Sequence, residues 1–148
     1  MTIKVGDKLP NITLSTMTEE GPKTVSIEEL CAGKKVVLFA VPGAFTPTCS
    51  NQHLPGFVSN STTLKEKGVD LVACISVNDP FVMAAWSKDR NAAEDILMLA
   101  DGNAEFTSAI GLEMDVSGFG MGIRSQRYAM IIDNGVVSKG LVPIDYIN

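Results

Sequence analysis

The chain has 148 residues, which suits a single domain spanning residues 1–148 with a core of its own. Hydrophobic residues make up 45% and charged residues 20%, and the mean hydropathy is +0.18, a composition typical of globular rather than disordered proteins. The net charge is −5 and no stretch concentrates lysine and arginine, which argues against nucleic acid as a partner. We therefore expect small molecules or proteins as partners.

Segments that would direct the chain to a membrane are not evident. The first residues contain no long apolar run, and the longest such run, residues 36–42, has the length of a buried strand. The three cysteines (Cys31, Cys49 and Cys74) form no Cys-x-x-Cys pair, which favours free thiols in a reducing compartment, and we expect the cytoplasm. Because there is one histidine, we expect no metal site, and no motif predicts a cofactor.

The first half of the chain predicts strands, turns and helices in alternation. A short helix should open at Ser26, with Glu28 and Glu29 in its first turn and Gly33 past its end. The remaining expected elements are a strand (12–15), a polar segment with a Gly-Pro turn (16–23), a buried β-branched strand (35–41), a helix bent near Pro55 (47–67) and a second buried strand (69–77).

The second half predicts a helix from Asp79 or Pro80 to Asn91, followed by shorter elements. These are a strand (96–100), a short helix (104–110), a glycine-dense loop (118–122) and two strands (127–132 and 136–141) around an Asn-Gly hairpin turn. The glycine-dense loop lacks the Lys-Ser or Lys-Thr ending of a phosphate loop. The order is that of an α/β protein with a mixed central sheet, flanking helices and a C-terminal β-hairpin, and it resembles the thioredoxin-like fold.

The segment between the strand at 35–41 and the next helix carries the candidate chemistry. Thr46 is a suitable N-cap and Pro47 suits the first helical position, which puts Cys49 at the third. There its sulfur would lie among unpaired N–H groups at the positive end of the helix, which favours the nucleophilic thiolate. Pro42 would stiffen the approach, and the Thr46 hydroxyl would lie near the sulfur. A well-capped helix with an incidental cysteine would carry the same pattern.

The spacing of Pro42, Thr46 and Cys49 resembles the proline-x3-threonine-x2-cysteine signature of peroxiredoxins. The strings PGAFTPTCS, HLPGF (53–57) and SVND (76–79) are similar to the type II plant and type five animal branch. The resemblance implies that Arg127 is the arginine that completes the site and that Arg124 supports it. It also implies a thiol peroxidase that reduces hydroperoxides through a sulfenic acid at Cys49, with an antioxidant and redox-signalling role.

The sulfenic acid must be reduced by a second thiol, and no cysteine follows Cys74 in the sequence. The resemblance aligns Cys74 with a cysteine that plant relatives can use for this step. Cys74 lies inside the apolar run 69–77, roughly 10 Å below its end at about 3.3 Å per residue, whereas a disulfide needs Cα atoms within about 7 Å. We therefore predict a buried thiol and an external reductant, with glutathione and glutaredoxin favoured over thioredoxin.

Other features give weaker expectations. The resemblance implies a homodimer, which we expect to form through Phe81 and Trp86. His53 lies four residues after Cys49 and could contribute a hydrogen bond near the site, or act as the base of a Cys–His hydrolase. No orienting Asn or Asp follows in a recognisable pattern, so the hydrolase ranks low. A non-catalytic redox sensor is the remaining alternative, but it would need neither Thr46 nor Arg127.

Overall fold

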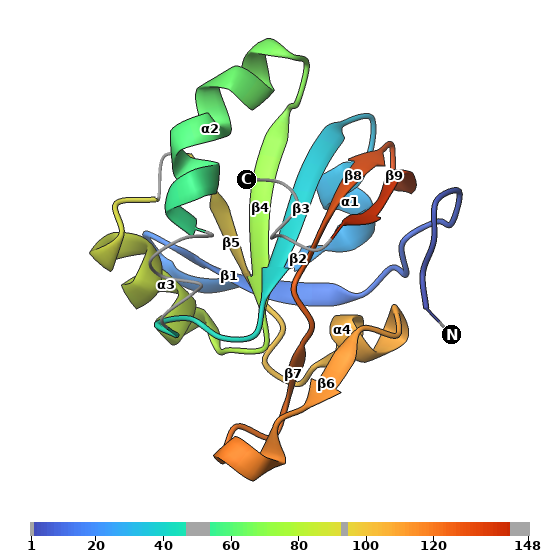
Figure 1. Ribbon diagram of the computed structural model, residues 1–148. Helices are drawn as coiled ribbons and strands as arrows, with labels where there is room; N and C mark the ends of the chain where they lie inside the picture. Colours follow the sequence, from blue (N-terminus) through green and yellow to red (C-terminus); the bar gives the residue numbers. More distant parts are fainter. Residues whose placement is uncertain (1, 47–53, 93–94, 143–148) are drawn as a thin grey trace.

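The computed structural model describes residues 2–46, 54–92 and 95–142 (Figure 1). Its strands are β1 (Thr13–Thr18), β2 (Gly21–Ser26), β3 (Lys35–Val41), β4 (Leu71–Ser76), β5 (Leu97–Ala100), β6 (Glu113–Asp115), β7 (Ile123–Ser125), β8 (Tyr128–Asp133) and β9 (Val136–Val142). Its helices are α1 (Ile27–Cys31), α2 (Leu54–Glu66), α3 (Pro80–Asp89) and α4 (Glu105–Ala109), and a 3₁₀ turn, η2, covers Ser117–Phe119. Among the helices of these ranges, none combines the length and the apolar character needed to cross a membrane.

A seven-stranded mixed sheet, in the order β2-β1-β5-β4-β3-β8-β9, forms the centre of the described structure. The strands β3, β4 and β5 are parallel, and β8 runs antiparallel beside β3. The β8–β9 hairpin closes that edge around Asn134 and Gly135, both of which have positive φ angles (50° and 83°), as the tight turn requires. The predicted α/β fold with a C-terminal hairpin is therefore confirmed.

Strand alternation divides the core into two faces. Along β3, the side chains of Val36, Leu38 and Ala40 pack on one face, whereas Val37, Phe39 and Val41 pack on the other. Helices α1 and α4 contribute to the first face; we call it the α1–α4 face. Helices α2 and α3 contribute to the second, the α2–α3 face. Because both faces are covered, β3 is a continuous run of apolar residues after Lys35, and its predicted bounds are the observed ones.

Helix α2 is attached to β3 by a pair of aromatic rings. Phe57 stacks on Phe39 with a centroid separation of 3.9 Å and an interplanar angle of 5°. The predicted start of this helix at Pro47 lies outside the described residues. Pro55 lies in the described part of this helix. This stack holds the described part of α2 against the sheet.

Two predictions about secondary structure were wrong. The polar segment Thr16–Lys23 was expected to turn at Gly21-Pro22, but β1 continues to Thr18 and pairs with β2 as a hairpin that turns at residues 19–20, so that Gly21 and Pro22 are strand residues. Its polar side chains fit a strand pair at the edge of the sheet, where β2 is half-buried or exposed along its length. The strands β6 and β7 were also missed: they pair with each other outside the main sheet and project from it with η2 (Figure 1).

The expected role of Trp86 at a dimer interface is also wrong. Its side chain has no exposed surface and packs in the α2–α3 face with Met83. Helix α3 begins with Asp79 as N-cap and Pro80 in its first turn, as predicted. This start leaves Phe81 outside the core, with 64% of its surface exposed. Only Phe81 of the two residues is therefore available to a partner.

Candidate active site

The carboxyl ends of the three parallel strands meet at one end of the sheet. Val41 at the end of β3 pairs with Ser76 at the end of β4, and Ser76 pairs with Ala100 at the end of β5. Tyr128, the first residue of β8, pairs with Ala40. The loop after β3 therefore lies beside the residues that follow β4 and the residues that precede β8, which is where ligand sites form in such sheets.

The loop Pro42–Thr46 is held in a compact turn. The backbone N–H of Thr46 donates to the Gly43 carbonyl at 3.4 Å, and the Thr46 hydroxyl donates to the same carbonyl at 2.8 Å. Phe45 adopts a left-handed conformation with φ 65°, which is uncommon for a residue with a Cβ. Since the only proton of the Thr46 hydroxyl is committed to Gly43, the oxygen offers hydrogen-bond acceptor positions to anything that binds beside it.

Cys49, the candidate nucleophile, lies outside the described residues, as does His53. Pro42 and Thr46 are half-buried and lead directly into this undescribed segment. The far end of the segment joins α2, which the Phe39–Phe57 stack holds against β3. The predicted start of the helix and the place of its cysteine therefore remain predictions.

Arg124 braces the loop and does not stand open to solvent. Its Nε donates to the Met121 carbonyl at 3.0 Å, and its Nη1 donates to the Val77 carbonyl at 3.2 Å. A Cβ built on Gly43 would lie 3.2 Å from Nη1, which shows how closely the guanidinium packs against the loop. The half-buried side chain thus joins β7, the end of β4 and the loop after β3. Its expected auxiliary role in the reaction remains a prediction.

Arg127 directly precedes Tyr128 and is half-buried. Because Tyr128 pairs with Ala40, the backbone of Arg127 lies beside the end of β3, where the loop begins. The pairing brings a permanently charged guanidinium to the same end of the sheet as Pro42 and Thr46. Its predicted contact with substrate remains a prediction.

Asn78 is a residue of the site that the sequence did not single out beyond its place in the SVND string. Its Oδ1 accepts hydrogen bonds from the Ala44 backbone N–H at 3.0 Å and from the Ser76 hydroxyl at 2.6 Å. The signal that could have found it is positional: a polar side chain follows the end of a buried strand beside the strand that leads into Pro42.

The two described cysteines are both buried. Cys74 has no exposed surface, lies two residues before the end of β4 and packs in the α2–α3 face, which confirms its predicted burial. Cys31 is 1% exposed on the α1–α4 face, and burial raises the pKa of its thiol, an effect that nearby Lys34 partly offsets. Burial also raises the pKa of Tyr128 strongly, with smaller contributions from Asp101 and Cys74.

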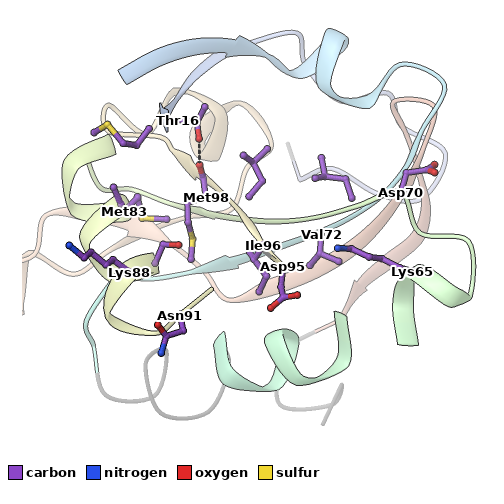
Figure 2. Close-up of a pocket in the computed structure, with 15 residues that line it drawn as sticks. Thr16, Lys65, Asp70, Val72, Met83, Lys88, Asn91, Asp95, Ile96 and Met98 are labelled. Carbon is purple, nitrogen blue, oxygen red and sulfur yellow. Dashed lines mark hydrogen bonds between the residues drawn. The ribbon is translucent and has the colours of Figure 1, made fainter. Parts of the chain in front are cut away.

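A cavity of about 790 Å³ lies between α2 and α3, away from the candidate site (Figure 2). It borders the amino ends of β4 and β5, at Asp70 and Asp95, whereas the candidate site lies at their carboxyl ends. Three of its apolar lining residues, Val72, Ile96 and Met98, are buried in the core. Within the described ranges, no group of three or more acidic, histidine or cysteine side chains could hold a metal ion.

Comparison with known proteins agrees with the geometry. A family model described as Redoxin matches residues 4–146. Chloroplastic peroxiredoxin-2E of Arabidopsis thaliana is 55% identical over 139 residues, which cover 91% of this chain and 59% of that protein. Chloroplastic peroxiredoxin-2E-2 of Oryza sativa subsp. japonica is 56% identical over 141 residues, which cover 92% of this chain and 63% of that protein. The chain thus spans about three fifths of the length of these two relatives.

A solved structure is similar over nearly the whole fold. The crystal structure of reduced Prx3 from Vibrio vulnificus in complex with H₂O₂ is 64% identical, with a TM-score of 0.92, and the match covers 95% of this chain and 88% of that one. On the family model, these relatives and this structural likeness, the chain belongs to the redoxin family and, within it, to the type II peroxiredoxins.

Proposed function

We propose that the chain is a thiol-dependent peroxidase that reduces hydrogen peroxide and alkyl hydroperoxides through Cys49. The observation that carries this proposal is the hydrogen bond from the Thr46 hydroxyl to the Gly43 carbonyl. It leaves the threonine oxygen as an acceptor at the end of the sheet where Arg127 supplies positive charge. The near oxygen of a hydroperoxide carries a proton that it can donate, and negative charge develops on the far oxygen as the O–O bond breaks. The two groups match these two needs.

In the proposed reaction, the Cys49 thiolate attacks the near oxygen of ROOH, which carries the proton. The S–O bond forms as the O–O bond breaks, the sulfur loses two electrons, and the peroxide proton stays on the transferred oxygen; RO⁻ leaves and takes a proton from water to become ROH. Thr46 accepts a hydrogen bond from the peroxide O–H and so aligns the near oxygen with the sulfur. Arg127 stabilises the charge on the far oxygen through several donors in one plane. The product on the enzyme is Cys49 sulfenic acid.

The proposed reductant is an external thiol. One thiol condenses with the sulfenic acid to a mixed disulfide and water, and a second thiol releases Cys49 as a thiolate or thiol. The burial of Cys31 and Cys74 supports this route, because neither sulfur is exposed for an internal disulfide without local unfolding. We propose that glutathione with glutaredoxin is the reductant, ahead of thioredoxin. We also propose that the protein works in a reducing compartment, the cytoplasm.

The test is consumption of hydrogen peroxide and of an alkyl hydroperoxide with dithiothreitol, glutathione plus glutaredoxin, or thioredoxin plus its reductase, each offered separately. The wild-type protein should turn over, Cys49→Ser should be inactive, and Cys31→Ser and Cys74→Ser should keep turnover with the external reductant. A Cys49→Ser variant as active as wild type would overturn the proposed function. A dominant Cys49–Cys74 disulfide after one equivalent of peroxide, with turnover lost in Cys74→Ser, would contradict the external route.

We also propose a homodimer in which Phe81 contacts the partner. Phe81 is 64% exposed beside the residues that follow β4, and Phe45, on the loop after β3, is 49% exposed. Ile123, on β7, is 44% exposed next to Arg124, which joins these segments. Large apolar side chains gathered on neighbouring segments are a feature of protein–protein contact surfaces.

A further inference from the structure

We propose that Asn78 is a positioning residue that fixes the Thr46 hydroxyl as a hydrogen-bond acceptor by anchoring the peptide group between Gly43 and Ala44. The inference rests on the proposed peroxidase function, since it concerns how Thr46 meets the peroxide. Asn78 acts through this peptide and is given no contact with the substrate.

The orientation of the Asn78 amide is dictated by its partners. The Ala44 N–H can only donate, so the atom 3.0 Å from it must be the side-chain oxygen of Asn78. The hydroxyl of Ser76, a fully buried residue, donates to the same oxygen at 2.6 Å. Two donors on one oxygen hold the amide in a single orientation at the end of β4. The loop after β3 is therefore anchored to the neighbouring strand by a side chain.

The anchored peptide transmits this orientation to Thr46. A trans peptide is planar, and its N–H and C=O point in opposite directions. The N–H of Ala44 and the carbonyl of Gly43 belong to the same peptide, and that carbonyl accepts the Thr46 hydroxyl proton at 2.8 Å. Holding the N–H with Asn78 therefore aims the carbonyl at Thr46. The carbonyl in turn accepts the hydrogen bond that the Thr46 hydroxyl would otherwise donate to a ligand.

Without Asn78, this peptide has reason to rotate. Gly43 lacks a Cβ, so its backbone is freer than that of other residues, and Phe45 is held at φ 65°. The side chains of Arg124 and Thr46 pack closely against Gly43, where a Cβ would lie 3.2 Å from both Arg124 Nη1 and Thr46 Cγ2. This packing leaves no room for a side chain at Gly43 that would restrict its backbone. If the carbonyl turns away, the Thr46 hydroxyl loses its acceptor and can donate. A Thr46 hydroxyl that donates its proton to the peroxide cannot accept the hydrogen bond from the peroxide O–H in that same contact.

The experiment compares two reactions of the same sulfur in Asn78→Ala. The second-order rate of Cys49 with hydrogen peroxide should fall at least about tenfold, whereas its alkylation by iodoacetamide, which has no proton for Thr46 to accept, should stay within about twofold at each pH. Asn78→Ser, which is too short to reach Ala44, should show the same loss. Asn78→Asp keeps the acceptor, so its rate per thiolate should stay within about threefold of wild type.

Two comparisons separate positioning from general damage. Asp79→Ala removes the neighbouring N-cap bond to Val82 and should lower the Tm while leaving the peroxide rate unchanged. In a Thr46→Val background, Asn78→Ala should cause no further loss, because the hydroxyl through which it acts is gone. A peroxide rate unchanged in Asn78→Ala, an equal fall in both reactions, or an undiminished loss in the Thr46→Val background would each overturn the inference. A wild-type protein inert toward peroxide would overturn the proposed function as well.

Discussion

Burial separates the cysteines that the structure describes from the one expected to react. Burial raises the pKa of the Cys31 thiol, so this group stays protonated to a higher pH than an exposed cysteine. Cys74 has no exposed surface from which a reagent could reach it. Cys49, at the expected start of a helix and near Arg127, should instead ionise below the usual value of about 8.5.

Iodoacetamide labelling of the native protein as a function of pH, read peptide by peptide by mass spectrometry, tests this separation. Labelling of Cys49 should reach half its maximum rate at least about one pH unit below 8.5, and Cys31 and Cys74 should remain unlabelled there. All three should react equally once the protein is unfolded in urea, which controls for intrinsic reactivity. Equal labelling of the three cysteines in the native protein would contradict the prediction.

The residues of the site could be predicted from the sequence only where the reason was local. Pro42 and Thr46 belong to one short segment, and their spacing from each other and from Cys49 was enough to identify them. Their place directly after β3 is confirmed. The contacts of Asn78 with Ala44 and of Arg124 with Val77 join residues 34 and 47 positions apart. Such contacts depend on which strands become neighbours, and no local pattern specifies them.

At the scale of elements, the helices differ in which groups accept hydrogen bonds from the backbone N–H groups of their first turns. Ser26 caps α1 by accepting the Glu29 N–H at 3.1 Å near the surface. Helix α4 has no side-chain cap at Ala104, and the buried Asp101 accepts instead from Phe106 N, Thr107 N and Thr107 Oγ1, at 3.2, 2.8 and 2.7 Å. Because Asp101 is 3% exposed, water cannot replace these partners if they are lost.

Asp101→Asn should therefore cost more stability than Ser26→Ala. The asparagine presents an N–H₂ group to at least one of the three donors, and we expect a loss of about 2 kcal/mol in the free energy of unfolding. The exposed cap in Ser26→Ala should cost about 1 kcal/mol. Urea denaturation of both variants, with equal m-values, measures the difference. A larger loss for Ser26→Ala would show that burial does not govern the cost of these caps.

The elements found from sequence were those with a strong apolar period or a clear cap. Strand β3, with six buried residues in succession, and helix α3, with Asp79 and Pro80 at its start, are examples. The β1–β2 hairpin was missed because its polar residues lack that period. Strands β6 and β7 have three residues each, which is too short for any period to be detected.

At the scale of the whole molecule, the proposed dimer should depend on Phe81. Phe81→Asp places a charge in the proposed contact and should shift the protein toward monomer, measured by sedimentation velocity across a range of concentrations. Val5→Asp is the matched control, because Val5 is also exposed, at 53%, but lies in the N-terminal segment outside the proposed contact. A wild-type protein that is monomeric throughout, or equal shifts in both variants, would contradict the proposed contact.

The position of β3 in the sheet has a consequence for the order in which the protein can be made. Its neighbour β4 follows it within about thirty residues, but its other neighbour, β8, begins only at Tyr128. During synthesis, one hydrogen-bonding edge of the apolar strand Lys35–Val41 therefore stays unpaired until β8 has left the ribosome. An unpaired apolar edge is a template for pairing with another chain. Products of interrupted translation that stop before β8 carry that edge permanently and are prone to aggregate.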